Sequence, residues 1–190
     1  MSAVRIRPAV LEAAGDVAAL ALLRRAAASE AGPVPADDDF GRRFTAWVRA
    51  QAHQRTFWLA ESRGGGERPA GMRLPVGMVG LTRYERPPRP GEPVTTAWGY
   101  LGALFVLPDH REGGTGGALV EAALAHARDT GLVRVVLSPG GTRAAPLYKR
   151  LGFRTARELL VHPLERDAPE DDEPAGLDDL VHPLDLHPLD

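Results

Sequence analysis

Residues 104–119 read LFVLPDHREGGTGGAL, the most glycine-rich turn of the chain with an apolar run before it. An apolar run leads into a proline, then into a turn with an arginine and four glycines in five positions, and then into a helix-like stretch. Glycine lets the backbone bend tightly and leaves its N–H groups uncovered by side chains. A helix that begins directly afterwards adds unpaired N–H groups and the positive end of its dipole. The stretch therefore predicts a strand, a turn suited to a phosphate or pyrophosphate, and a helix.

Other interpretations of this turn can be compared with the spacing of its residues. A Rossmann fingerprint needs glycine or alanine three positions after Gly116, where Leu119 stands. A P-loop needs a lysine, and no lysine lies near this turn. Both nucleotide motifs are therefore disfavoured, and a plain strand-to-helix turn with surplus glycine remains the alternative to a binding site.

Length and composition limit the class of protein. A chain of 190 residues with 44% hydrophobic residues fits one globular domain with a sizeable core. It contains no apolar run of about 18 residues, so no membrane span is expected. The N-terminus lacks the apolar core of a signal peptide, and the absence of cysteine excludes disulfides, thiolate metal sites and a cysteine nucleophile. We expect a cytoplasmic location.

Charge is distributed unevenly along the chain. Residues 165–190 hold ten acidic residues and one arginine, which leaves 22 basic and 15 acidic residues for residues 1–164, a balance of +7. A basic body suits a polyanionic ligand. Nucleic acid is not expected as a partner, because no interleaved aromatic and basic pattern accompanies the charge.

Hydrophobic periodicity predicts a mixed α/β fold, a central β-sheet flanked by helices in the order β-α-α-β-β-β-α-β-α-β. Asp16 is the expected N-cap of the first helix, and the three aspartates 37–39 are expected to begin the second as caps and dipole partners rather than as a metal site. The expected strands are residues 4–7, 55–61, 75–84, 96–107, 132–137 and 152–161; the expected helices are residues 16–25, 37–51, 116–130 and 142–151.

The strand at residues 96–107 is apolar on both of its alternating faces, which is typical of a central strand covered on both sides. Because side-chain direction repeats every two residues, Tyr100 and Leu104 are expected on the same face.

Two motifs together resemble those of one family. Val106, Arg111, Gly114 and Gly116 spell V-x-x-x-x-R-x-x-G-x-G, and residues 147–153 read LYKRLGF, about 30 residues later with one expected strand between them. The first is similar to the acyl-CoA-binding motif of the GNAT N-acetyltransferase superfamily, and the second to its L-Y-x-x-x-G-F segment. The resemblance covers residues 100–161, while the N-terminal half matches in element order only.

The resemblance implies an N-acyltransferase that moves an acetyl or other short acyl group from acyl-CoA to a primary amine by direct attack in a ternary complex. The acceptor is a small molecule or a protein, and no metal is involved. The alternative is a catalytically silent acyl-CoA-binding module that acts as a sensor or scaffold.

The resemblance also implies roles for single residues. Leu104, Phe105 and Val106 would pair their main chain with the pantetheine arm, and the Leu104 N–H would donate to the thioester oxygen. The pyrophosphate would be held by main-chain N–H groups of Arg111, Glu112, Gly113, Gly114, Thr115, Gly116 and Gly117.

Tyr148 would protonate the departing thiolate, because the ordinary pKa of a phenol, about 10, is close to that of a thiol. The general base is open: Tyr100 stands where some relatives carry a glutamate, and Glu85, Glu92 and His110 are other candidates. The structural alternatives are a core role for Tyr148 and pocket lining for Tyr100.

Two residues depart from the family pattern. Glu112 brings a negative charge near the pyrophosphate, and Gly113 replaces a usual cation. Arg111, Arg143 and Lys149 could compensate. Both departures weaken the case for tight binding of CoA.

The acidic tail, residues 165–190, is expected to form a segment distinct from the acyltransferase domain, residues 1–164. It could be a mobile solubilising tail. Its opposite charge also suggests that it docks on the basic body near the CoA cleft or on a second subunit of a homodimer.

Ending the chain at Leu164 tests the docking. A tail docked near the cleft makes the full-length and shortened proteins differ in CoA affinity, and salt reduces the difference because it screens charge. Titration calorimetry with CoA at several salt concentrations measures both affinities. Equal affinities at every salt concentration would exclude docking.

Overall fold

A computed structural model describes residues 4–63, 73–91, 96–139 and 144–156. The described residues fall into two compact units, divided between Leu137 and Ser138, and each unit is considered by itself. The predictions for Glu92, Arg143 and the tail, residues 165–190, lie outside the described residues.

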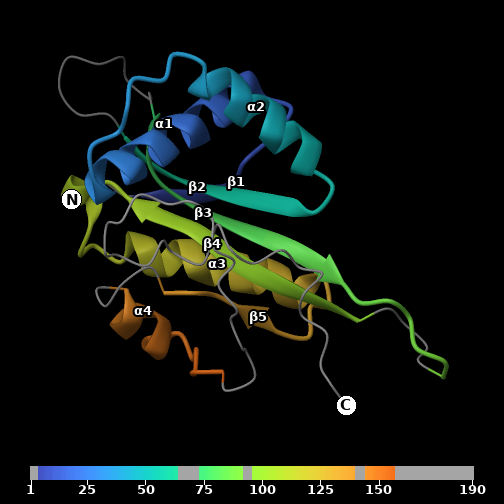
Figure 1. Cartoon of the computed structure of the whole chain (residues 1–190). Helices are drawn as coiled ribbons and strands as arrows, with labels where there is room; N and C mark the ends of the chain where they lie inside the picture. The colour runs from blue at the N-terminus through green and yellow to red at the C-terminus, as the bar shows by residue number, and fades with distance from the viewer. Residues whose placement is uncertain (1–3, 64–72, 92–95, 140–143, 157–190) are drawn as a thin grey trace, which may run out of the picture. The chain divides into compact units, whose positions relative to one another are not determined.

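The first unit is built on a five-stranded mixed sheet in the order β1-β2-β3-β4-β5 (Figure 1). The first four strands pair antiparallel with their neighbours, and β5 runs parallel to β4. The expected mixed α/β fold is therefore confirmed. The strands are β1 (Arg5–Pro8), β2 (Arg55–Arg63), β3 (Arg73–Glu85), β4 (Ala97–Val106) and β5 (Val135–Val136).

Helices cover both faces of this sheet, with α1 and α2 on one side and α3 on the other (Figure 1). They are α1 (Ala14–Ala31), α2 (Phe40–Gln51) and α3 (Thr115–Asp129), and a short 3-10 helix, η1 (Pro108–His110), precedes α3. The second unit contains α4 (Ala145–Arg150). The element order agrees with the prediction as far as α4.

Two predicted strands differ from the structure. The strand expected at residues 132–137 is reduced to the two residues of β5, because only these pair with β4. Residues 153–156, the described part of the strand expected last, are not in a strand, and residues 157–161 lie outside the described residues.

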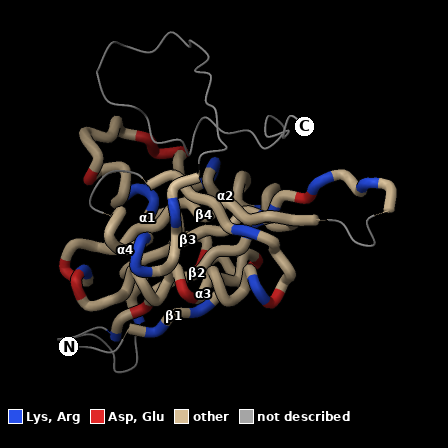
Figure 2. Tube along the Cα trace, turned by 90° about the horizontal axis from the view of Figure 1, so that it is seen from below, with Lys and Arg blue, Asp and Glu red and all other residues tan. Residues whose placement is uncertain are grey.

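Basic and acidic residues are interspersed along the described trace (Figure 2). Two of the three aspartates before α2 form ion pairs with arginines of that helix. Asp39 contacts Arg42 at 2.9 Å and Asp37 contacts Arg43 at 2.5 Å. The carboxylates of Asp37 and Asp39 thus form ion pairs with arginines of α2. Asp39 is at the N-cap position, but its side chain does not cap the helix.

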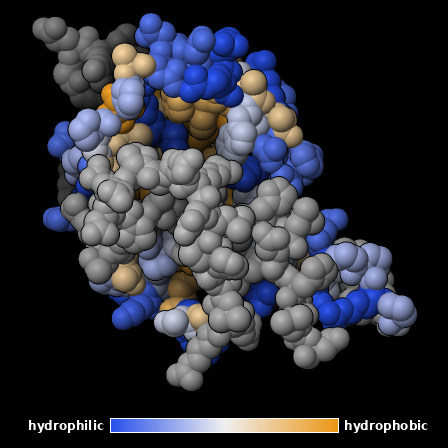
Figure 3. Space-filling view, viewed as in Figure 1, coloured by the Kyte–Doolittle hydropathy of each residue, from blue (hydrophilic) through white to orange (hydrophobic). Residues whose placement is uncertain are grey.

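The core on the α1 side consists of aliphatic and aromatic side chains from α1, α2, β2 and β3. In Figure 3 the outer surface of α1 and α2 is largely hydrophilic, and hydrophobic atoms are visible beneath it. Buried members of this core are Val17, Leu20, Leu23, Val48, Phe57, Leu59 and Met78.

On the other face α3 lies close to β3 because Gly77 has no side chain. A Cβ at this glycine would stand 2.9 Å from the Phe105 carbonyl oxygen and 3.2 Å from the Leu119 side chain. Leu119 is fully buried. Any larger residue at position 77 would push α3 or β4 away from the sheet.

A β-bulge interrupts β4. Gly102 opposes Gly80 and Phe105 opposes Met78, so two steps along β3 match three steps along β4. Ala103, inside the bulge, has a φ of 54°, a left-handed conformation that is uncommon for residues other than glycine. Tyr100 and Gly102 therefore share their face with Phe105, and the prediction that Tyr100 and Leu104 share a face is wrong.

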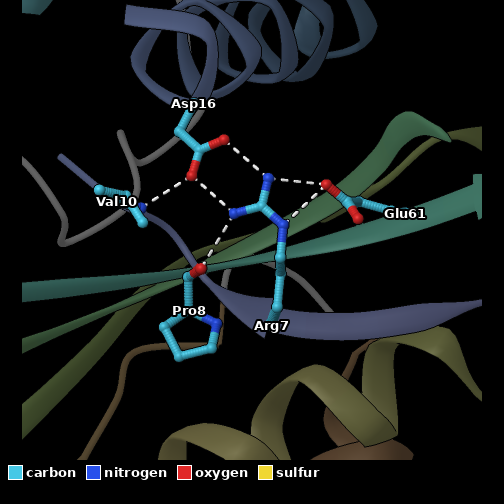
Figure 4. Close-up of polar contacts among 5 residues, drawn as sticks. All are labelled: Arg7, Pro8, Val10, Asp16 and Glu61. Atoms are coloured by element: carbon cyan, nitrogen blue, oxygen red, sulfur yellow. Dashed lines mark hydrogen bonds and ion pairs between the residues drawn. The ribbon is translucent and has the colours of Figure 1, made fainter. Parts of the chain in front are cut away.

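Asp16 lies in the first turn of α1 rather than at its N-cap, which is Ala13. Its carboxylate accepts a hydrogen bond from the Val10 N–H at 2.7 Å and two from Arg7 at 2.6 and 2.7 Å (Figure 4). Arg7 also donates to Glu61 of β2 at 2.8 Å. The expected helix start is wrong because Asp16 joins α1 to β1 and β2 instead of capping the helix.

The Arg7 hydrogen bonds lower the pKa of Asp16 below its ordinary value of 3.8 and raise that of Arg7. Both Asp16 and Glu61 are largely shielded from solvent, with side chains 13% and 12% exposed. Removal of the guanidinium would leave two partly buried carboxylates beside each other without a counter-charge.

We expect Arg7→Ala to lower the free energy of unfolding by about 2 kcal/mol at pH 7. Arg42→Ala, which breaks an exposed pair, is the matched control and should cost less than about 0.5 kcal/mol. Because the pKa of Asp16 is lowered in the folded state, its contribution is present above pH 3.8 and is lost as the pH falls through the folded value. Urea unfolding at several pH values measures this; a gap between the variants that persists unchanged at low pH would contradict it.

Candidate functional site

The turn from β4 to α3 combines two left-handed residues. Glu112 has a φ of 64° and Gly114, the N-cap of α3, a φ of 81°. Space is open around Gly114, since a Cβ there would meet no heavy atom within 4 Å. A glycine is favoured at this position by its backbone conformation rather than by crowding.

This turn presents a row of main-chain donors. Arg111 N–H donates to the Pro108 carbonyl at 3.1 Å, and Ala118 N–H donates to the Gly114 carbonyl at 3.0 Å. Between them, within the described part of the chain, the N–H groups of residues 112–117 have no hydrogen-bond acceptor. Together with the N-terminal end of α3 they form the kind of site that binds an anion.

The predicted phosphate-binding residues therefore divide into two groups. Arg111 does not contribute its amide, because that N–H is already bonded to Pro108. The others lie together in the turn and the first turn of α3: Glu112, Gly113, Gly114, Thr115, Gly116 and Gly117.

Among the described residues, one edge of β4 is unpaired over much of its length. β5 pairs with β4 only at Gly99 and Tyr100, where the Gly99 N–H donates to the Arg134 carbonyl at 2.9 Å. Beyond Tyr100, no strand among the described residues pairs with this edge of β4. Leu104, Phe105 and Val106 lie in this part of the strand, next to the turn.

The Arg111 side chain is directed toward α1. Its Nε donates to the Val106 carbonyl at 2.8 Å, its Nη2 contacts a Glu30 carboxylate oxygen at 2.5 Å, and its Cζ lies 5.7 Å from the centre of the Phe105 ring. The hydrogen bond to Glu30 raises the pKa of Arg111. Sequence reasoning missed Glu30, because nothing local signals a partner 81 residues away.

The candidate bases lie in different surroundings. Tyr100 opposes Thr82, a buried residue of β3, and is half-buried. Glu85 is 61% exposed and contacts Arg83 at 3.1 Å. His110 is half-buried at the end of η1, close in sequence to the donor row. His110 is thus next to the turn, whereas Tyr100 lies in the first half of β4, nearer to Ala97, the partner of Glu85, than to the turn.

The second unit holds Tyr148, the buried residue of α4. Its ring makes an edge contact with Phe153, with centroids 5.7 Å apart. The Phe153 N–H donates to the Tyr148 carbonyl at 3.0 Å, and Gly152, with a φ of 87°, allows the chain to turn back after the helix. The LYKRLGF segment is therefore a helix with a glycine stop that packs Phe153 on the tyrosine ring.

Within the described ranges, no group of three His, Cys, Asp or Glu side chains could hold a metal ion. Among those same residues, no helix combines the length and apolar character that crossing a bilayer requires.

Comparison with known proteins assigns the family. The family model described as "Acetyltransferase (GNAT) family" matches residues 19–153. No curated protein matches the chain.

Solved structures share the fold. A GCN5-related N-acetyltransferase from Ralstonia eutropha JMP134 is 28% identical, with a TM-score of 0.60 over 85% of this chain and 99% of that one. A predicted acetyltransferase from Clostridium acetobutylicum, solved with acetyl-CoA, is 17% identical, with a TM-score of 0.63 over 85% and 96%. A ribosomal-protein-alanine N-acetyltransferase from Brucella melitensis biovar Abortus 2308 is 20% identical, with a TM-score of 0.58 over 85% and 100%. With its fold and more than half its length matched, the chain belongs to the GNAT family of acetyltransferases.

Proposed function

We propose that this protein transfers an acetyl or other short acyl group from acyl-CoA to a primary amine of a small-molecule or protein acceptor, by direct attack in a ternary complex. The observation that carries the proposal is that the N–H groups of residues 112–117 have no partner among the described residues, in a chain of this family.

The described residues fit the pyrophosphate of CoA. Six consecutive N–H groups, a helix N-terminus and the open space around Gly114 suit an anion with several oxygens. Glu112 opposes this fit, because its N–H belongs to the row and its negatively charged side chain would lie near the phosphates. The main-chain donors act at contact distance, and the exposed carboxylate can turn toward solvent.

The open edge of β4 suits the pantetheine arm. An extended amide-bearing chain can add to an exposed strand edge through main-chain hydrogen bonds. Leu104, Phe105 and Val106 would provide these, and the Leu104 N–H would donate to the thioester oxygen as it gains negative charge. A preorganised donor of this kind contributes about 3 kcal/mol to the transition state.

The reaction needs a base and an acid. The acceptor ammonium loses a proton, the free amine forms an N–C bond with the acyl carbon, and the C–S bond breaks. Tyr148 would give its phenolic proton to the leaving thiolate. Tyr100 would relay the ammonium proton through water to the solvent, and His110, Glu85 and Glu92 are alternatives as the base.

A silent acyl-CoA-binding module is the second candidate. The specific observation in its favour is that Tyr100 stands at the position of a catalytic carboxylate in some relatives, and that Glu112 adds a negative charge to the turn. Such a module would bind CoA without consuming its thioester.

Tyr148→Phe separates these functions. We expect the variant to lose kcat by about 10²- to 10⁴-fold, because the general acid is removed, while CoA affinity stays unchanged. Acetyl-CoA consumption with a panel of amines, together with calorimetry on both proteins, measures this. If no amine consumes acetyl-CoA while CoA binds to the wild type, the module is the function; if CoA does not bind, both proposals fail.

Glu112→Gly is expected to strengthen CoA binding by about three- to tenfold at low salt. The change removes a negative charge near the phosphates, and glycine adopts the left-handed conformation of this residue more readily. Glu121→Gln, at an exposed position of α3, is the control with the same change in charge. Unchanged or weaker affinity in Glu112→Gly would contradict the assignment of the turn to the phosphates.

A further inference from the structure

The Arg111 side chain contacts Glu30 of α1, the Val106 carbonyl at the end of β4, and the ring of Phe105. Glu30 belongs to α1, and Phe105 packs against the core between α1, α2 and the sheet. The donor row opens α3, whose Leu119 packs beneath Gly77 on the opposite face. Arg111 therefore connects a loop that serves one face of the sheet to the helix on the other.

The geometry of this connection suits a structural tie. Nε is used for the Val106 carbonyl at the end of β4, and Nη2 is used for Glu30 in the last turn of α1. The Arg111 side chain is only 21% exposed. A planar guanidinium can hold both partners at once because its N–H groups have a fixed arrangement.

We propose that Arg111 is a positioning residue: with Glu30 it forms a latch that fixes the phosphate-binding turn against α1 and thereby sets the affinity for CoA. In this role Arg111 does not lend its charge to the phosphates. The proposal rests on the proposed function for the ligand that it names, and on the contacts of Arg111 for the latch itself.

The latch and a direct phosphate contact predict opposite signs for one substitution. Where Arg111 binds phosphate directly, Glu30 is a competing anion, and Glu30→Gln tightens CoA binding. Where the latch holds, Glu30→Gln loosens the turn. CoA binding is then weaker, because part of the binding free energy is used to order the donor row.

Titration calorimetry with CoA on the full-length protein measures the sign. We expect Glu30→Gln to weaken binding by about three- to tenfold. Arg111→Gln should weaken it further because the Val106 bond is lost as well, and adding Glu30→Gln to Arg111→Gln should have little extra effect. Arg111→Lys should resemble Arg111→Gln, since a lysine keeps the charge but cannot hold both partners.

Glu12→Gln is the matched control. Glu12 is exposed just before the start of α1, so the substitution makes the same change in net charge at the opposite end of this helix, about 27 Å away. Its CoA affinity should equal that of the wild type.

Hydrogen exchange tests the latch without CoA. The His110 and Arg111 amides are protected by bonds of 2.9 and 3.1 Å within the turn. Their exchange should accelerate in Glu30→Gln relative to Glu12→Gln, while the amide of Val79 in the core stays as slow as before.

Two outcomes would overturn the latch: unchanged exchange at His110 and Arg111 in Glu30→Gln, or CoA affinity in that variant equal to or tighter than in the wild type. If the wild-type protein binds no CoA, the proposed function fails, and exchange at the two amides alone decides whether the latch exists.

Discussion

The short parallel pairing between β4 and β5 is the constraint on which the site depends. Two residues of β5 pair with β4, and the rest of that edge has no strand beside it in the described part of the chain. The chain passes from β4 through the turn into α3, so the N-terminus of α3 follows the end of β4. Among the described residues, an unpaired strand edge and a set of unpartnered N–H groups are therefore neighbours. Both offer main-chain donors, which bind a ligand by its shape and phosphates rather than by its side groups.

The bulge in β4 modifies what this edge presents. One extra residue lies between Gly102 and Phe105, so the alternation of side chains along β4 shifts by one position at the bulge. Tyr100 and Phe105 consequently face α1 and α2, the side on which Arg111 also lies. Tyr100 and the Arg111–Glu30 pair therefore lie on the α1 side of the sheet. The donor row precedes and begins α3, which lies on the other side.

Charge around the turn is balanced by specific pairs. The resemblance would place the positive charge of Arg111 beside the phosphates, yet this side chain contacts Glu30 and the Val106 carbonyl. Glu112 lies within the donor row and adds a negative charge there. The proposed binding of CoA would thus rely on main-chain dipoles more than on side-chain charge, and its affinity would depend on how well ordered the turn is.

Local sequence patterns sufficed to predict the glycine turn, α3 to within one residue at each end, the short helix before Gly152, and the mixed sheet with its order of elements as far as α4. Glycine and helix signals act over a few positions, so they can be read locally. Four features became visible in the folded chain alone: the bulge at Ala103, the reduction of β5 to two residues, the contacts of Arg7 with Asp16 and Glu61, and the pairing of Arg111 with Glu30. Each of these depends on strand register or on a partner from a distant segment, and no local pattern specifies either.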